Sequence, residues 1–222
     1  MDMIAQNMME TLKEENLSHD EMRSYAFSKA ERIAASTARL RAVIEHLRMF
    51  GRKVDGETQV FDSRESLKAA LMLIQSRFER ADIRLSLYQA EEALPVLGHT
   101  ILFEQVLLNL LNNAADALEA LPSGKERRVS VELEGDKDRL RLMVEDSGGG
   151  MPAALIGRAQ EAYFTTKPAD KGTGLGLSIS SEILREMEGD LGLTNGERGL
   201  RATITVPLVQ DDRELQSKAA AQ

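Results

Sequence analysis

Two glycine clusters that follow an asparagine-bearing helix constrain this chain more than any other feature. The clusters are residues 146–150, DSGGG, and residues 172–177, GTGLGL, and the pattern before them predicts a helix over 105–116, QVLLNLLNNAAD. Glycine lets the backbone approach a ligand closely, and a glycine-rich turn entering a helix presents free N–H groups to phosphate. Amide oxygens on a helix can bind a hard cation. Together these features predict a nucleotide-binding domain.

The composition narrows the class of protein. The chain has 222 residues, 42% of them hydrophobic, which suffices for one domain with an appendage or for two small domains. A formal net charge of −8 argues against nucleic acid as a partner, and the absence of cysteine excludes disulfides, thiolate zinc sites and cysteine nucleophiles. No apolar run is long enough to cross a bilayer. We therefore expect a cytoplasmic location with no membrane contact within this chain, and any membrane sensor would lie outside it.

The first part of the chain, residues 1–53, is predicted to be helical. Small and apolar residues recur there at alternating spacings of four and three: Ala26, Ala30, Ile33, Thr37, Leu40, Ile44 and Leu47. This heptad-like stripe predicts a helical hairpin or a dimeric bundle, and a single amphipathic helix packed on its own domain is the alternative. A junction is expected between Gly51 and Gly56, and residues 210–222 are expected to form a polar tail.

Between these parts, residues 57–209 mix both kinds of secondary structure. Helices are predicted over 63–80, 100–121 and 175–188, and strands over 58–61, 83–88, 95–98, 129–133, 140–144, 190–194 and 202–206. Most of the connections between strands are short enough for hairpins. The pattern therefore favours an α+β sandwich over a doubly wound parallel sheet.

The polar residues of this region form candidate binding groups. Gln105, Asn109, Asn113 and Asp116 follow i, i+4, i+8, i+11 spacing, so they share one helix face. That face holds amides where Lys and Glu would be better helix formers, although an ordinary solvated face remains possible. Asp146 ends a predicted strand, where a carboxylate can accept a hydrogen bond from an amine such as that of adenine. The alternative for Asp146 and its glycines is a plain tight turn.

A polar loop, residues 163–171, YFTTKPADK, separates the two glycine clusters. Such loops often serve as lids over ligands, with Phe164 packed at the root and Lys167 or Lys171 reaching a phosphate. A solvated loop without a role is the alternative. The second glycine cluster lacks the preceding strand and downstream acid of a dinucleotide site, and the Lys-Ser/Thr of a P-loop.

In order and spacing, these blocks resemble the catalytic ATP-binding domain of sensor histidine kinases, in the superfamily shared with gyrase, Hsp90 and MutL. Residues 109–114 (NLLNNA) resemble the N box, 146–151 (DSGGGM) the G1 box, 164–167 (FTTK) the F box and 172–178 (GTGLGLS) the G2 box. Residues 199–203 (GLRAT) are similar to the closing strand of the family. The resemblance covers about residues 57–209 and implies a mixed sheet covered by helices on one face.

The resemblance also implies roles for individual residues. Asn113 would contribute its side-chain oxygen to Mg²⁺ that bridges the ATP phosphates, and Asn109 would support that catalytic site. Asp146 would bind the adenine amine. The other residues implied to contact the nucleotide are Gly148, Gly150, Phe164, Lys167, Gly172, Gly174, Leu175, Gly176, Leu177 and Thr203, the last through the water network around adenine.

Two positions bear on the reaction that the resemblance implies. In the gyrase-like branch a glutamate one turn before the metal-binding Asn activates water, whereas this chain has Asn109 there. That difference favours phosphotransfer to a protein over ATP hydrolysis. Many histidine kinases carry a basic residue where this chain has Asp116, so we expect no phosphate contact from that position.

The resemblance continues into residues 1–53. Residues 20–53 resemble the second helix of the kinases' dimerisation hairpin, and residues 3–14 the end of the first. The phosphoacceptor histidine normally stands farther upstream, in the pattern His-acidic-x-x-x-Pro. An acidic residue follows the histidine directly, and a proline follows that acidic residue four positions later. None of His19, His46 and His99 has both. We therefore expect a C-terminal piece of a histidine kinase, truncated after its phosphoacceptor histidine.

Such a piece would bind Mg-ATP without autophosphorylating. It would form a homodimer through residues 1–53 and have a response regulator receiver domain as its partner. The alternative is a non-catalytic ATP-binding scaffold that docks a response regulator.

Overall fold

The computed structural model describes residues 23, 58–167 and 172–210. Apart from Arg23, the predicted hairpin of residues 1–53 lies outside the described residues, as does the predicted tail from residue 211 onward. The chain divides into two compact units, Gly56–Phe164 with Leu175–Gln222 and Met1–Asp55 with Thr165–Gly174. Every described strand belongs to the first, which we call the sheet unit. Among the described residues, no helix is both long and apolar enough to span a bilayer.

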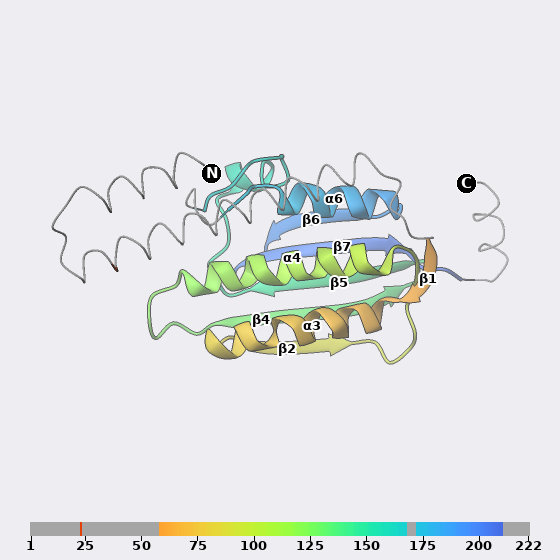
Figure 1. Ribbon diagram of the computed structural model, residues 1–222, viewed down its shortest axis with the longest axis horizontal. Helices are drawn as coiled ribbons and strands as arrows, with labels where there is room; N and C mark the ends of the chain where they lie inside the picture. The colour runs from red at the N-terminus through yellow and green to blue at the C-terminus, as the bar shows by residue number, and fades with distance from the viewer. Residues whose placement is uncertain (1–22, 24–57, 168–171, 211–222) are drawn as a thin grey trace. The chain divides into compact units, whose positions relative to one another are not determined.

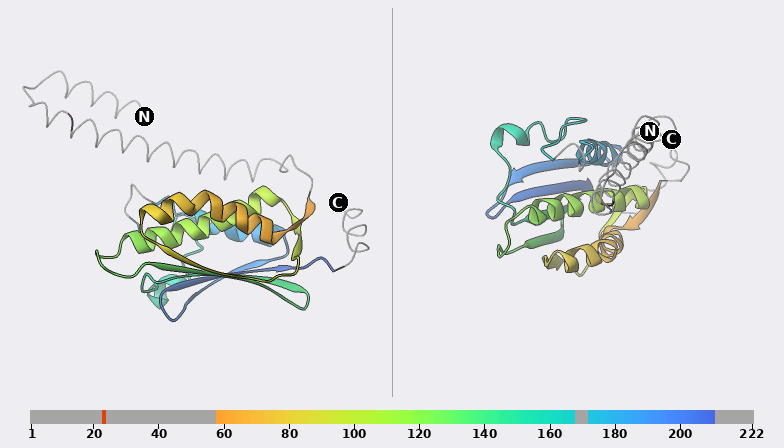
Figure 2. Two further views of the ribbon diagram at one scale, coloured as in Figure 1. Left: turned by 90° about the horizontal axis from the view of Figure 1, so that it is seen from below. Right: turned by 60° about the vertical axis from the view of Figure 1, so that its left-hand side comes forward.

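The sheet unit is a two-layer α+β structure, as the sequence predicts. Its elements are β1 (Gln59–Asp62), α3 (Ser63–Arg80), β2 (Arg84–Gln89), β3 (Pro95–Gly98), α4 (Thr100–Glu119), β4 (Arg128–Asp136), β5 (Arg139–Asp146), α5 (Ala153–Ile156), α6 (Gly176–Glu186), β6 (Asp190–Asn195) and β7 (Leu200–Pro207). Helices α3, α4 and α6 lie over one face of the larger sheet (Figure 1, Figure 2). The α+β class is therefore confirmed.

The larger sheet has five strands in the order β2-β4-β5-β7-β6. Strand β2 runs parallel to β4, and the other neighbours are antiparallel, so the sheet is mixed. Strands β1 and β3 form a separate antiparallel pair. The carboxyl end of β5 and the amino end of β7 lie side by side, which brings Asp146 next to Leu200.

The core lies between the sheet and the three helices. Alternation along the central strands directs one set of apolar side chains toward the helices, and these are buried: Val129, Val131, Leu133, Leu140, Leu142, Val144, Ala202, Ile204 and Val206. Of these three helices, α4 contributes the most buried residues, including Val106 and Leu111. Phe103 of α4 is fully buried and packs against Phe61 of β1, with ring centroids 5.6 Å apart. This packing fixes the position of α4 over the centre of the sheet.

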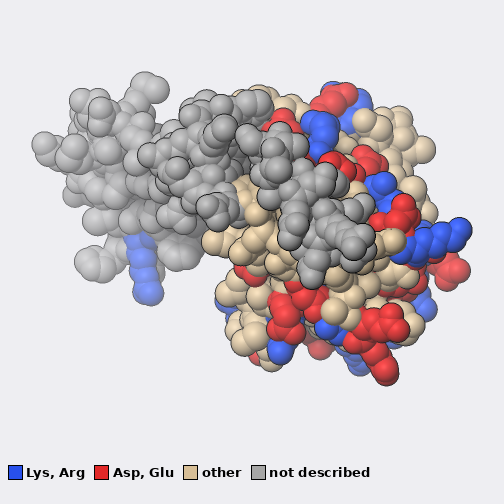
Figure 3. All heavy atoms as spheres, turned by 90° about the vertical axis from the view of Figure 1, so that its right-hand side faces the viewer, with Lys and Arg blue, Asp and Glu red and all other residues tan. Residues whose placement is uncertain are grey.

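The edge of the sheet differs from its centre. Leu85 and Leu87 of β2 are 40% and 48% exposed, although their alternation predicts a half-buried strand. Among the described strands, β2 has a neighbour on one side alone, so its inward side chains are less completely covered. On the surface shown in Figure 3, acidic and basic side chains are interspersed and do not gather in a basic patch.

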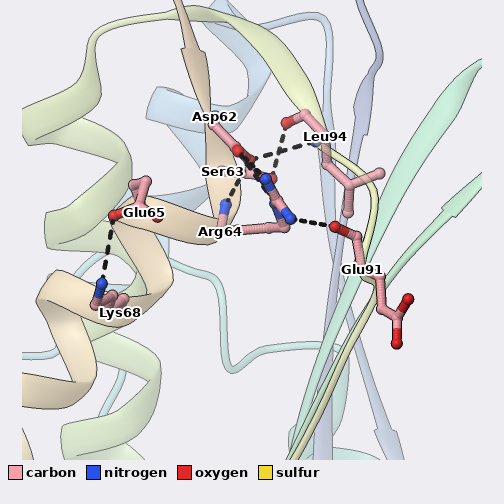
Figure 4. A network of polar contacts seen from close by, with 7 residues as sticks. All are labelled: Asp62, Ser63, Arg64, Glu65, Lys68, Glu91 and Leu94. Atoms are coloured by element: carbon pink, nitrogen blue, oxygen red, sulfur yellow. Dashed lines mark hydrogen bonds and ion pairs between the residues drawn. The ribbon is translucent and has the colours of Figure 1, made fainter.

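A polar network around Asp62 fixes the start of α3 (Figure 4). Asp62 Oδ1 caps the helix by accepting hydrogen bonds from the backbone N–H of Arg64 (3.1 Å), and it also accepts from Leu94 N–H (3.3 Å). The Arg64 guanidinium binds the same carboxylate, with 2.6 Å between Nη2 and Oδ2, and donates to the Glu91 carbonyl. Ser63 Oγ donates to the Leu94 carbonyl at 3.0 Å. The network joins β1, α3 and the segment before β3.

We expect Asp62→Ala to lower the free energy of unfolding by about 1–2 kcal/mol, because the helix cap and the anchor for Leu94 are both lost. Urea unfolding followed by circular dichroism measures this. Glu65→Ala is the matched control: Glu65 lies in the first turn of the same helix and is exposed, and its ion pair with the exposed Lys68 is 3.8 Å long, so a change within about 0.5 kcal/mol is expected. Equal losses in the two variants would contradict the capping role.

The effect of Asp62 should also depend on pH. Burial alone would raise the pKa of Asp62, but hydrogen bonds from Arg64 and Leu94 outweigh it and hold the pKa below its usual value. A carboxyl with a lowered pKa stabilises the fold above its unfolded pKa, and this contribution is lost as the pH falls through the folded value. The stability difference between wild type and Asp62→Ala should therefore shrink below about pH 4.

Candidate functional site

Asp146 is the buried carboxylate of the site. It follows Leu142 and Val144 on the helix-covered face of β5 and is 6% exposed. Its Oδ1 accepts hydrogen bonds from the N–H groups of Gly148 (2.7 Å) and Leu200 (3.4 Å). In the described part of the chain, no hydrogen bond is made to Oδ2. Burial raises the pKa of Asp146, and the two backbone hydrogen bonds oppose that shift. Oδ2 is thus placed to accept a hydrogen bond from a ligand.

Two glycines make room for Asp146. A Cβ on Gly148 would come within 3.1 Å of the Ala117 Cβ on α4 and 2.9 Å of Asp146 Oδ1. A Cβ on Gly199 would overlap both the backbone oxygen and Oδ1 of Asp146. The carboxylate is therefore enclosed by backbone on two sides, one from the loop after β5 and one from the β6–β7 turn.

The start of α6 also packs directly on α4. Asn109 Nδ2 donates a hydrogen bond to Ser180 Oγ at 2.9 Å, and Ser180 is buried. A Cβ on Gly176, the first residue of α6, would overlap Asn109 Oδ1. Leu175 before it is also buried, and its carbonyl accepts a hydrogen bond from Ser178 Oγ. The second glycine cluster thus leads into α6 at the point where this helix contacts Asn109 of α4.

One face of α4 therefore connects the two glycine clusters. Asn109, Asn113 and Ala117 are spaced i, i+4, i+8 and share that face. The first meets Gly176 and the last meets Gly148. Asn113 lies midway between them, about 6 Å along the helix axis from each. Asn109 and Ala117 thus each contact one glycine cluster, and Asn113 lies between these two residues on the same face of α4.

Arg77 of α3 holds the adjacent face of α4. Its guanidinium donates hydrogen bonds to Asn112 Oδ1 (2.7 Å), Asp116 Oδ1 (2.5 Å) and both carboxylate oxygens of Glu119 (2.9 Å). The hydrogen bonds from Arg77 lower the pKa of Glu119. These three residues are spaced by four and three positions, so they lie on one face of α4, and their contacts with Arg77 fix the rotation of the helix about its axis. Asp116, from which no phosphate contact is expected, pairs here with Arg77.

Three of the predicted nucleotide-binding residues belong to the other compact unit, with Thr165–Gly174. Lys167 N–H donates to Thr165 Oγ1 at 3.1 Å. A Cβ on Gly172 would lie 2.5 Å from the same Oγ1 and 3.0 Å from the Lys167 Cβ, so Gly172 and Lys167 are close neighbours. Gly174 has φ +68°, a conformation that favours glycine.

The segment that leads to these residues is anchored within the sheet unit. The Arg158 guanidinium lies over the Phe164 ring, 4.7 Å from its centroid. Gln160 Nε2 donates to the Leu191 carbonyl of β6 at 2.6 Å, and its Oε1 accepts from Ser181 Oγ of α6 at 3.1 Å. Phe164 is thus the last residue of a tethered segment, the position expected for the root of a lid.

Thr203 lies on the other face of the sheet from Asp146. It pairs with Met143, next to the Glu145–Arg201 pair, whose salt bridge of 2.6 Å lies on the open face. Side chains alternate along a strand, so Asp146 and Thr203 point to opposite faces. The predicted contact of Thr203 with water around adenine has no support in this geometry, and we leave Thr203 out of the site.

Several supporting residues are absent from the sequence prediction. Ala117 continues the i, i+4 spacing of Asn109 and Asn113, and this spacing alone could have identified it. Arg77, Gln160 and Ser180 carry no comparable signal, because their partners come from distant parts of the chain.

Comparisons with known proteins bear on the family and the fold of this chain. Residues 98–210 match the family described as histidine kinase-, DNA gyrase B-, and HSP90-like ATPase. The two-component sensor PprA of Pseudomonas aeruginosa is 34% identical over 204 residues, which is 91% of this chain and 22% of PprA. The C4-dicarboxylate transport sensor protein DctB of Rhizobium meliloti is 36% identical over 176 residues, which is 78% of this chain and 27% of DctB. The chain thus spans about a quarter of the length of these curated relatives.

Solved structures share the fold. The nucleotide-free catalytic domain of histidine kinase ThkA superposes with a TM-score of 0.60 at 28% identity, covering 68% of this chain and 98% of the ThkA chain. ThkA in complex with response regulator protein TrrA gives a TM-score of 0.71 at 21% identity, covering 93% of this chain and 57% of that one. The second likeness concerns the fold alone.

We expect Gly199→Ala to lower the free energy of unfolding by about 1–3 kcal/mol, because the new methyl group overlaps backbone and carboxylate atoms of Asp146. Gly192→Ala on the neighbouring strand is the matched control, since a Cβ there meets only the Thr203 carbonyl oxygen at 3.8 Å. Urea unfolding of both variants measures the difference. A Gly199→Ala chain as stable as Gly192→Ala would contradict the close approach.

Proposed function

Because the chain belongs to the family of histidine kinase-, DNA gyrase B- and HSP90-like ATPases, we propose that it is the phosphate-donor part of a sensor histidine kinase. Its ATP-binding catalytic domain binds Mg-ATP. The γ-phosphate passes to a histidine of a dimerisation domain, for relay to an aspartate of a response regulator. The observation that carries this proposal is the position of Asn113 between the two glycine clusters on one face of α4.

The two ends of the site suit the two ends of ATP. Asp146 Oδ2 accepts a hydrogen bond from the adenine amine, in a pocket shaped by Gly148 and Gly150. At the other end, the start of α6 at Gly176 and Leu177 offers backbone N–H groups to phosphate. The lid residues that we propose to join it are Phe164 at the root and Lys167, Gly172, Gly174 and Leu175 toward the phosphates.

Asn113 suits Mg²⁺ as a protein ligand. Its amide oxygen is a hard donor, and Mg²⁺ commonly takes few protein ligands and completes its shell with phosphate oxygens and water. Among the described residues, no group of three or more His, Asp or Glu could hold a metal by itself. Bound there, Mg²⁺ would neutralise charge that develops on the phosphates. Asn113 and the phosphate oxygens of the nucleotide would thus hold Mg²⁺ together.

The residue at position 109 favours transfer over hydrolysis. A carboxamide has no basic group that could take a proton from water at neutral pH. The Asn109 amide is also engaged, since its Nδ2 donates to Ser180 and its Oδ1 lies against Gly176. We therefore propose a structural role for Asn109 in the catalytic site, and a protein side chain as the phosphate acceptor.

The remaining parts of the chain are proposed from the sequence. In this proposal, residues 1–53 form a dimerisation hairpin and residues 57–209 the catalytic domain. The proposed partner is the receiver domain of a response regulator, and ThkA has been solved in complex with a response regulator protein. A non-catalytic scaffold that binds ATP and docks a response regulator is the second candidate. It is favoured by the histidines, none of which has both the acid and the proline expected of a phosphoacceptor.

We expect Asn113→Ala to lower the affinity for Mg-ATP at least tenfold, because the protein ligand to Mg²⁺ is removed. Isothermal titration calorimetry measures this, and thermal unfolding verifies that the variant remains folded. Asn112→Ala is the matched control on the same helix: Asn112 binds Arg77 and the Leu108 carbonyl, so its loss should lower stability and leave Mg-ATP affinity within about twofold. Unchanged affinity in Asn113→Ala would count against the metal site.

We expect the chain incubated with Mg-ATP to carry no phosphohistidine, because His19, His46 and His99 lack the phosphoacceptor context. Mass spectrometry at alkaline pH checks this, and a stable phosphohistidine on any of the three would refute it. Adding a domain that carries the acceptor histidine then separates the two candidates. ATP-dependent transfer to that domain supports the kinase, whereas nucleotide binding without transfer supports the scaffold.

A further inference from the structure

The side chain of Asn195, at the end of β6, forms a two-way clamp on the loop after β5. Asn195 Oδ1 accepts a hydrogen bond from Met151 N–H, and Asn195 Nδ2 donates one to the Met151 carbonyl, both at 2.9 Å. One carboxamide thus satisfies both backbone groups of a single residue, as a neighbouring strand would. From this geometry we infer that Asn195 is a positioning residue for adenine recognition by Asp146. The inference rests on the proposed function of Asp146.

The clamp explains a glycine of the first cluster. Gly150 has φ +78°, and a Cβ there would lie 2.5 Å from Asn195 Oδ1. Position 150 therefore has to be glycine for two reasons, its left-handed backbone and the carboxamide that lies against it. Gly149 N–H adds a further bond between the same two segments, donating to the Arg198 carbonyl at 3.2 Å.

The clamp also determines the orientation of Asp146. The carboxylate oxygen Oδ1 is held from both clamped segments at once, by Gly148 N–H from the loop and by Leu200 N–H from β7. Asn195 is the direct strand partner of Leu200. Asn195 therefore sets the separation between the two donors. While both donors reach Oδ1, the carboxylate cannot rotate, and Oδ2 keeps one direction toward a ligand.

A carboxamide is required for this clamp. It donates through nitrogen and accepts through oxygen, whereas an ionised carboxylate of the same shape only accepts. In Asn195→Asp, one carboxylate oxygen would face the Met151 carbonyl oxygen, so one hydrogen bond becomes a repulsive contact. The substitution changes the hydrogen bonding and leaves the volume almost unaltered, which makes it the sharpest test.

The experiment compares two nucleotides on the whole chain by calorimetry with Mg²⁺ present. One is ATP, and the other is purine riboside triphosphate, which is ATP without its exocyclic amine. We expect the wild type to bind ATP at least tenfold more tightly, as for a hydrogen bond to a charged group. Asn195→Asp should reduce this preference to about twofold or less, chiefly by weakening ATP. Thr194→Ala, an exposed neighbour on the open face, should keep the full preference.

Each other outcome has a definite meaning. Equal weakening of both nucleotides in Asn195→Asp would overturn the inference, because it would show a general structural role. A wild-type preference that survives in the variant would overturn this inference alone. A wild type that binds both nucleotides equally would overturn the role of Asp146 itself, and this inference with it. If Asn195→Asp does not fold, Asn195→Ala removes the clamp without adding a charge, and the same comparison applies.

A second measurement tests the contact with Gly150. We expect Gly150→Ala to weaken ATP binding several-fold less in the Asn195→Ala background than in the wild type. The left-handed backbone affects both backgrounds alike, so only the overlap with Oδ1 differs. Strictly additive effects of the two substitutions would overturn the proposed packing.

Discussion

The packing of α4 on the sheet is the constraint on which the rest of the structure depends. One face of the helix is buried in the core, a second is held by Arg77, and a third carries Asn109, Asn113 and Ala117. With two faces fixed, the third has no rotational freedom. The loop after β5 and the start of α6 each pack against that third face through a glycine. The geometry of the polar site therefore depends on how the apolar core is packed.

The buried carboxylate shows how the fold prepares for a ligand. Burial penalises the charged form of Asp146, and two backbone N–H groups offset that penalty at Oδ1. A ligand amine at Oδ2 would supply the missing hydrogen bond. The protein thus buries a carboxyl group that is held by backbone N–H groups from the loop after β5 and from β7, and a ligand amine would reduce the cost of burying its charged form.

Much of this arrangement could be predicted from the sequence. Helix α3 has the predicted bounds, and α4 and α6 differ from theirs by one or two residues at the ends, because helical spacing and strand alternation are local signals. The short helix α5 is missed, since four residues carry no periodicity. The face of Thr203 and the partners of Arg77 and Asn195 depend on strand register and distant contacts. The hairpin of residues 1–53 stays a prediction.

The contact between Gly176 and Asn109 couples two positions that a sequence shows as independent. Asn109 Oδ1 fills the space that a side chain at position 176 would need. A glutamate at position 109 would be one methylene longer than asparagine, and in the orientation of Asn109 it would press into the start of α6. A longer side chain at position 109 therefore needs either another rotamer or a displaced start of α6, so positions 109 and 176 constrain each other across the helix interface.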